Sequence, residues 1–513
     1  MNGLKLMLVL VIAVLPWLGQ AHVGSPDVFH DGEVGPYPVR ITIRMPTVVP
    51  GRAEISVRVQ GTQPEKVFFS PLFARTSITN APPPDLGVLI EGETNLYSGE
   101  LWLMSVGAYT IEIKLSGLLG TGKVQIPVSS VPLSQLPMPR FLGIILVGLG
   151  VILFFGGVAI VAAAARESVL APGGVIGKIE RRKGRLAAGI TTVILLLGLL
   201  GGRRWWNADE AKFRTQLRGG AWPDLKAAVR VEGTQRILRL TLGEVAFGSA
   251  YSVPLIPDHG KLLHLFLIRE GTQDGFAHLH PVRKGGNIFD VALPALPPGR
   301  YKVLCDLTME GSVLSSTATN SVEVPTLATQ ATLAEVMKPD PDDSWAVYAG
   351  IPVPKNSGVA AVYRLLDGSQ VEWKATAPIR VRQDAGLNFE VRNPSGQPVD
   401  LSPYMGMLSH AAILRSDGGV FSHLHPTGNY SMAAQAFFDK KLERETRTVD
   451  GAVAPMVDHS KMDHSGGHAK HKSGVSSISL PYEFPTAGDY RIWVQFKVGD
   501  QVQTAVFDTT VAD

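Results

Sequence analysis

The sequence is poor in cysteine, in net charge and in the motifs that mark common enzyme sites. One cysteine in 513 residues excludes an internal disulfide framework and a cysteine-rich zinc module. Because Cys305 ends the apolar run 301–305, we expect a buried, inert thiol. A net charge of +3, without a basic stripe interleaved with aromatics, argues against a nucleic-acid partner. No nucleophile elbow, phosphate loop or carboxylate pair stands out, so we predict that the protein is not an enzyme.

What the sequence does contain begins with segments suited to export and membrane attachment. Residues 1–21 carry Lys5, an apolar run and small residues ending at Ala21, as in a secretory signal peptide. The uncharged stretches 141–165 and 186–202 can each span a bilayer. The loop between them carries six Lys or Arg residues against two Glu residues, so the positive-inside rule places this loop in the cytoplasm.

The sequence thus predicts two transmembrane helices within residues 139–204 that anchor exported modules. We expect the inner (cytoplasmic) membrane as the location, with the modules facing the periplasm. Neither span carries a charged residue or a histidine, so we do not expect the anchor to form a transport path. Cleavage of the signal peptide and the number of associated chains stay open.

The exported parts read as β-rich modules with a common ending. Each has a Gly-x-Tyr motif before its last strands, which resembles the tyrosine corner of immunoglobulin-like sandwiches. The motif begins at Gly107, Gly299 and Gly488. We therefore predict a mainly β protein with three sandwiches, either immunoglobulin-like or cupredoxin-like. The predicted modules are residues 22–138, 218–326 and 327–513.

The second and third modules share a pattern. It consists of a strand that begins with His, followed by a turn and then by His-Leu-His-Pro. The copies occupy residues 264–281 and 410–426. Because alternate residues of a strand share a face, the two histidines of His-x-His lie side by side. A hairpin brings the strand's first histidine opposite them. The predicted trios are His264, His278 and His280 in the first copy and His410, His423 and His425 in the second.

The hairpin register depends on where each turn is centred. A two-residue Asp417-Gly418 turn of the favoured type places His410 opposite His425. In the first copy, a centre at Thr272 sets the corresponding register. Each trio could hold a copper or zinc ion. The alternative is that these histidines pack in the core or brace the strand ends, with no metal.

Residues that precede each trio could change which metal ion it prefers. Met405 and Met407 would alternate onto one strand face just before His410, and thioether sulfur favours Cu(I). They could equally be core filler. Asp258 and His259 stand at the corresponding place in the first copy, where an ordinary polar turn is the other interpretation.

A third feature is a His/Met-rich insertion of the last module, at about residues 431–475. Its low hydrophobicity indicates a flexible loop that captures metal ions, with weaker binding below about pH 6. A hydrophilic loop without a role is the alternative. The candidate ligands are His459, Met462, His464, His468 and His471.

Cleavage after Ala21 would make His22 the first residue. Its α-amine and ring could then chelate copper together with His30. Copper redox chemistry at this terminus is the one enzymatic alternative that the sequence leaves open.

The strand-borne His trios behind a signal peptide resemble periplasmic copper-handling proteins of the CopC and YtkA-like kinds. The run 458–465, Asp-His-Ser-Lys-Met-Asp-His-Ser, is similar to the His/Met tracts of bacterial copper-resistance proteins. This resemblance implies binding, storage or delivery of copper, with zinc or silver as alternatives, and a membrane or periplasmic protein as the recipient. The competing prediction is an adhesion or scaffolding protein whose histidines are structural.

Overall fold

The computed structural model divides the chain into two compact units. One unit comprises residues 1–133 and 221–513, and the other comprises residues 134–220. The structure describes residues 27–134, 136, 138–171, 173–221, 224–233, 235–243, 254–310, 313–326, 337–375, 377–449 and 475–513. The predicted signal peptide, His22 and the five ligands of the His/Met tract lie outside these residues.

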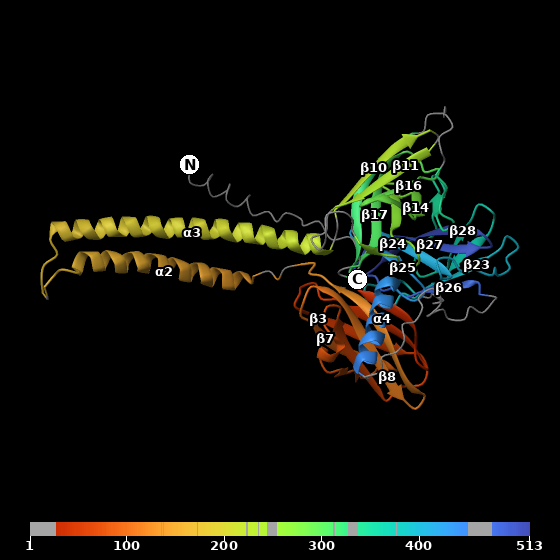
Figure 1. The fold of residues 1–513 in the computed structure, drawn as a ribbon, viewed down its shortest axis with the longest axis horizontal. Helices are drawn as coiled ribbons and strands as arrows, with labels where there is room; N and C mark the ends of the chain where they lie inside the picture. Colours follow the sequence, from red (N-terminus) through yellow and green to blue (C-terminus); the bar gives the residue numbers. More distant parts are fainter. Residues whose placement is uncertain are drawn as a thin grey trace. The chain divides into compact units, whose positions relative to one another are not determined.

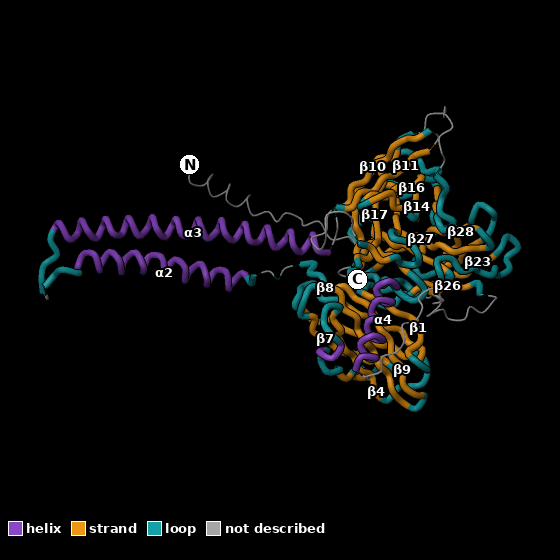
Figure 2. Tube along the Cα trace, viewed as in Figure 1, coloured by secondary structure: helices purple, strands orange, loops and turns teal. Residues whose placement is uncertain are grey.

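The larger unit is built from mainly antiparallel sheets that form three sandwiches, as predicted (Figures 1 and 2). Module 1 has one sheet in the order β1-β2-β3-β7-β6 and another in the order β5-β4-β8-β9. The first sheet contains β1 (Val28–Val34), β2 (Tyr37–Arg44), β3 (Gly51–Val59), β7 (Leu96–Leu103) and β6 (Val88–Leu89). The second contains β5 (Asp85–Leu86), β4 (Lys66–Phe73), β8 (Gly107–Gly117) and β9 (Gly120–Ser130).

Module 2 pairs a sheet in the order β10-β11-β16-β15 with a sheet in the order β12-β17-β13-β14-β19, to which β18 adds beside β17. The first sheet contains β10 (Leu225–Glu232), β11 (Gln235–Leu242), β16 (Ile288–Ala292) and β15 (Val282–Gly285). The second contains β12 (Leu255–Ile256), β17 (Gly299–Met309), β13 (His264–Arg269), β14 (Gly275–Leu279), β19 (Ser344–Val347) and β18 (Ser315–Val324). Strand β19 lies beyond residue 326, where we expected this module to end.

Module 3 has the sheets β20-β28-β27-β24-β25 and β21-β22-β23-β26. The first contains β20 (Lys355–Asn356), β28 (Gln501–Val511), β27 (Gly488–Val498), β24 (Ser409–Arg415) and β25 (Phe421–Leu424). The second contains β21 (Ala361–Arg364), β22 (Gln370–Trp373), β23 (Leu387–Arg392) and β26 (Ser477–Leu480).

The Gly-x-Tyr motifs begin β8, β17 and β27, each of which forms a hairpin with the next strand. In each case the tyrosine hydroxyl bonds to the backbone four residues upstream. The Tyr301 and Tyr490 hydroxyls donate to the carbonyls of Pro297 and Thr486, and the Tyr109 hydroxyl accepts from the Ser105 N–H. This geometry is that of a tyrosine corner and supports the immunoglobulin-like description of the sandwiches.

The smaller unit holds two long helices, α2 (Arg140–Glu167) and α3 (Lys178–Ala221). Both contain a stretch long and apolar enough to cross a membrane. They form a hairpin in which Gly184 lies so close to α2 that a side chain there would meet the Ala162 carbonyl. Since α3 begins at Lys178, much of the basic loop that we expected to connect the helices is itself helical.

The predicted flexible insertion is partly wrong, because its first part forms the helix α4 (Met432–Val449). Ala434 and Phe438, one turn apart, are buried and pack into the core cluster of module 2. Residues 432–449 carry apolar residues at helical spacing and so have a face that can be buried. The sequence of the His/Met tract has no such apolar pattern.

Modules 2 and 3 pack through the sheets that carry the histidine motifs. Along β13, Leu265 and Leu267 point into module 2's own core, whereas Phe266 and Ile268 join the core cluster of module 3. Phe276 of β14 stacks on Trp493 of β27, with ring centroids 4.9 Å apart. The hairpin β13–β14 is therefore buried on both faces, and its even-numbered side chains face the neighbouring module.

Candidate metal centre

The register of both histidine hairpins is the one that the sequence predicts. Leu265 pairs with Leu279 in the first hairpin, and Ala411 pairs with Leu424 in the second. One position further from the turn, His264 lies opposite His280 and His410 lies opposite His425. The rings of His410 and His425 are 4.9 Å apart between centroids.

The two-residue turn predicted for the second hairpin is wrong. A turn of that type needs positive φ at both central residues, and of the two only Gly418 has it, at 74°. The Arg415 N–H instead donates to the Val420 carbonyl, which closes a wider loop. The Asp417 carboxylate accepts hydrogen bonds from Arg415 and from the Gly419 N–H, and this holds the loop in its shape.

The two predicted trios lie next to each other. Because the β13–β14 face packs against module 3, the structure brings both hairpins into one cluster of imidazoles. We call this group the His cluster; it consists of His259, His264, His278, His280, His410, His423 and His425. The rings of His278 and His423, from different modules, have centroids 5.4 Å apart.

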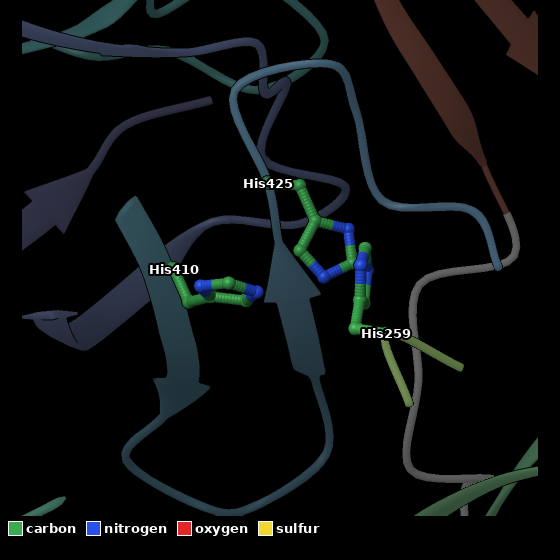
Figure 3. Close-up of side chains that lie close together, drawn as sticks. All are labelled: His259, His410 and His425. Carbon is green, nitrogen blue, oxygen red and sulfur yellow. The ribbon is translucent and has the colours of Figure 1, made fainter. Parts of the chain in front are cut away.

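Two groups within the His cluster have ligand atoms within 4.8 Å of one another. The first trio is His264, His278 and His280, as the sequence predicts. The second trio is His259, His410 and His425, with His259 in the place expected for His423 (Figure 3). His423 lies beside both, with its ring 5.3 Å from that of His264 and 4.5 Å from that of His425.

The sequence offers His259 as a residue that could modify the first trio, with an ordinary polar turn as the alternative, and does not predict it as a ligand of the second. The turn exists: the Asp258 and Lys261 backbones exchange two hydrogen bonds, and His259 has a φ of 50°. This conformation, uncommon outside glycine, directs the ring across the interface to the other module. Figure 3 shows His259 reaching His410 and His425 from a separate segment of the chain.

The N–H groups of the first trio point outward to acceptors. His264 Nε2 donates to the Asp258 carbonyl at 3.2 Å. With the Gln495 amide oriented as in the structure, His278 Nδ1 donates to Gln495 Oε1 at 2.9 Å. His280 Nδ1 donates to Asp343 Oδ1 at 3.0 Å. A neutral imidazole has one N–H, so the three inward nitrogens all present lone pairs.

Two of these lone pairs face each other closely. His264 Nδ1 and His278 Nε2 are 3.2 Å apart, and in the tautomers just described neither nitrogen carries a proton. Such a contact is repulsive unless a cation lies between the nitrogens. Metal-binding histidines typically make such outward hydrogen bonds, which fix the tautomer and raise the basicity of the ligand nitrogen. The carboxylate that accepts from His280 is the strongest partner of this kind.

Other ring nitrogens of the His cluster are buried without a partner in the described part of the chain. They include His280 Nε2, His423 Nε2 and both nitrogens of His410. An unpaired buried polar atom costs about 1–3 kcal/mol, so several of them together are comparable with a protein's whole stability of about 5–15 kcal/mol. Ligation removes that cost.

Several rings of the His cluster also favour the neutral form. Burial, followed by the neighbouring imidazoles, lowers the pKa of His264, His278 and His410 well below the usual value. Unprotonated nitrogens are the form that binds a metal. Carboxylates stand at the edge of the cluster, where Asp306 lies 3.3 Å from His423 Nδ1.

A cavity of about 220 Å³ adjoins the cluster where the three modules meet. Its lining includes His264, His423 and His425 together with Asp258 and Asp306. Imidazole and carboxylate groups of the centre are thus exposed to a space large enough to admit an ion and its water.

The remaining predicted ligands are placed differently. Met405 and Met407 do not alternate along a strand: they belong to a turn in which the Tyr404 and Met407 backbones exchange two hydrogen bonds. Met405 has a φ of 48°, which no strand residue adopts. His30 is buried in β1, and its Nδ1 lies 2.9 Å from the Tyr430 hydroxyl. Burial lowers the pKa of His30 to about 4.

The profile of a domain of unknown function (DUF8832) matches residues 364–513, most of module 3. No curated protein matches.

Two solved structures illustrate the likeness found. A chimeric titin Z1Z2 tandem carrying a fibronectin peptide is 12% identical over 57% of this chain and 100% of that one, with a TM-score of 0.11. Trypsin-activated alpha-2-macroglobulin from Escherichia coli is 8% identical over 96% of this chain and 28% of that one, with a TM-score of 0.15. Scores this low carry no argument about function.

Proposed function

We propose that this chain is a membrane-attached protein that binds transition-metal ions, copper above all, in the His cluster and stores or delivers them. The observation that carries the proposal is the first trio, whose three N–H groups are all turned outward so that three lone pairs converge. A purely structural role would instead let one ring donate an N–H to the other across the 3.2 Å between His264 Nδ1 and His278 Nε2.

Copper is the preferred ion because the described ligands are imidazoles and none is a thiolate. Imidazole suits copper and zinc, and a given nitrogen site binds Cu(II) more tightly than other divalent first-row metals. The two apolar helices of the smaller unit would attach the modules to the inner membrane. The positive charge around the start of α3 supports a cytoplasmic loop, and therefore modules on the periplasmic side.

The test uses the full chain in detergent. After removal of metal with a chelator, the protein is equilibrated with Cu(II) or Zn(II), dialysed, and its metal content is measured by elemental analysis. To isolate the His cluster, the experiment uses a parent variant in which the His/Met tract cannot bind. Its substitutions are His459→Asn, Met462→Leu, His464→Asn, His468→Asn and His471→Asn.

Two variants of this parent decide the outcome. His280→Gln removes a ligand nitrogen and should lower copper content, with an unchanged near-ultraviolet circular dichroism spectrum as the check on folding. His30→Gln is the matched control, because His30 is a buried histidine outside the His cluster that hydrogen-bonds to Tyr430. Loss of copper in this variant would point instead to the predicted N-terminal chelate of His22 and His30. Copper content equal in all three proteins, or no copper in the parent, would favour the adhesion or scaffolding alternative.

A further inference from the structure

The His cluster has approximate twofold symmetry that follows from the repeated motif. His264 corresponds to His410, and His278 corresponds to His423. The centroid distance from His264 to His423 is 5.3 Å, and the symmetry-related distance from His410 to His278 is 6.3 Å. The axis passes between His278 and His423, which are each other's counterparts.

Distances within each hairpin also agree with the approximate twofold symmetry. His264 and His280 are 5.2 Å apart, and His410 and His425 are 4.9 Å apart. The His-x-His pairs have centroid separations of 4.8 Å in module 2 and 4.5 Å in module 3. The two trios of hairpin histidines are therefore near copies of one arrangement, facing each other across the interface.

The symmetry extends to the turns that precede the hairpins. Residues 258–261 and 404–407 each form a two-residue turn whose flanking backbones exchange two hydrogen bonds. The first central residue is His259 in one turn and Met405 in the other, with φ of 50° and 48°, and glycine follows with φ of 80° in both. Both central residues stand five positions ahead of their hairpin's first histidine.

His259 shows where such a turn residue points. Its ring crosses to module 3 and lies 4.8 Å from His425 and 5.6 Å from His410. The backbone of Met405 lies close enough to the His259 ring to influence its pKa, so the two turns are near each other. Met405 itself is nine-tenths buried.

We infer that Met405 crosses in the opposite direction and supplies its sulfur as a fourth ligand to an ion held by the first trio. The His cluster is then an asymmetric two-ion centre. One ion is held by the first trio and a thioether, and the other by the second trio alone, with His423 between them. This inference rests on the proposed function and adds to it the number of ions and the identity of one ligand.

The asymmetry has a chemical consequence. Thioether sulfur is a soft ligand that selects Cu(I), whereas an all-imidazole set suits Cu(II) and zinc as well. The first-trio site should therefore prefer Cu(I), and the second-trio site should accept either oxidation state. Each ion has ligands from both modules, so loading both sites ties module 2 to module 3.

The experiment compares Met405→Leu with Met407→Leu in the tract-substituted parent. The two residues are alternate members of the same turn and are equally buried, at 9% and 8% exposure, so Met407→Leu is the matched control. Leucine keeps volume and apolarity and removes only sulfur. Each protein is loaded anaerobically with Cu(I), its copper per chain is counted, and copper X-ray absorption is recorded.

We expect two copper ions per chain and one sulfur for every two coppers in the parent and in Met407→Leu. In Met405→Leu the sulfur scattering should vanish, and competition with a Cu(I) chelator should show one site weakened at least about tenfold. The same parent labelled with selenomethionine should show copper–selenium scattering, a measurement that needs no substitution at Met405.

Failure of this inference and failure of the proposed function give different results. If the parent binds copper but shows no sulfur or selenium neighbour, or if Met407→Leu loses the scattering instead, the inference is overturned and the proposed function stands. One copper per chain overturns the two-ion centre in the same way. If the parent binds no copper at all, the proposed function fails with it.

Discussion

Asp343 offers the sharpest test of how the first trio is organised. One carboxylate oxygen, Oδ1, accepts both the His280 backbone N–H at 2.8 Å and His280 Nδ1–H at 3.0 Å. The other oxygen, Oδ2, accepts the Asp340 N–H at 3.1 Å. In Asp343→Asn the amide oxygen can keep the bonds to His280, but the negative charge is lost and an NH₂ group faces the Asp340 N–H.

The expected effect is on metal affinity more than on folding. Removing the carboxylate partner of a ligating histidine costs 10- to 100-fold in affinity, or about 1.4–2.7 kcal/mol. Loss of the bond to Asp340 should lower the stability of the metal-free protein by about 1 kcal/mol. Affinity is measured by competition with a chelator of known strength in the tract-substituted parent, and stability is measured by urea unfolding without metal.

The matched control is Asp384→Asn. Asp384 forms an ion pair with Arg40, between modules 1 and 3, and contributes nothing to the His cluster. It should leave the copper affinity within about twofold of the parent. If Asp343→Asn also binds copper with the parent's affinity, His280 is not a ligand, and the first trio does not form a site.

Three further outcomes follow from the structure. Copper at 100 times its dissociation constant should stabilise the protein by about 2.7 kcal/mol, which a calorimetric scan with and without chelator would detect; an unchanged transition would mean that metal binds folded and unfolded chains alike. Complete burial raises the pKa of the Cys305 thiol far above its usual value, so a thiol reagent should label Cys305 only after denaturation, and rapid labelling of the native protein would contradict its burial. Burial also lowers the pKa of His30 to about 4 from about 6.5 when unfolded, so the neutral ring's contribution is fully present above pH 6.5 and is lost as the pH falls toward 4, by up to about 3 kcal/mol. His30→Gln should flatten the dependence of stability on pH in that window, as unfolding curves at a series of pH values would show; an unaltered slope would assign the dependence to other groups.

Much of the local structure could be predicted from the sequence because it depends on short-range rules. The two-residue periodicity of strands and the hairpin registers place His264 opposite His280 and His410 opposite His425. The Gly-x-Tyr motif likewise locates the tyrosine corners at Tyr109, Tyr301 and Tyr490, because the bond spans only four residues.

The union of the two trios could not be predicted in this way. Strands β13 and β14 read as apolar on both faces, and periodicity does not say which face meets another module. The ligand role proposed for His259 depends on that union, since its ring crosses the interface. A signal did exist: His259-Gly260 and Met405-Gly406 occupy equivalent positions in the repeat, and a turn position shared by two copies indicates a shared conformation.

The repetition of a module within one polypeptide has a consequence for how such a centre can evolve. Two identical subunits facing each other across a twofold axis must place the same side chain at both equivalent turns. Joining the copies in one gene removes that constraint, because each codon can then drift alone. Histidine at position 259 and methionine at position 405 are a difference that no homodimer could encode.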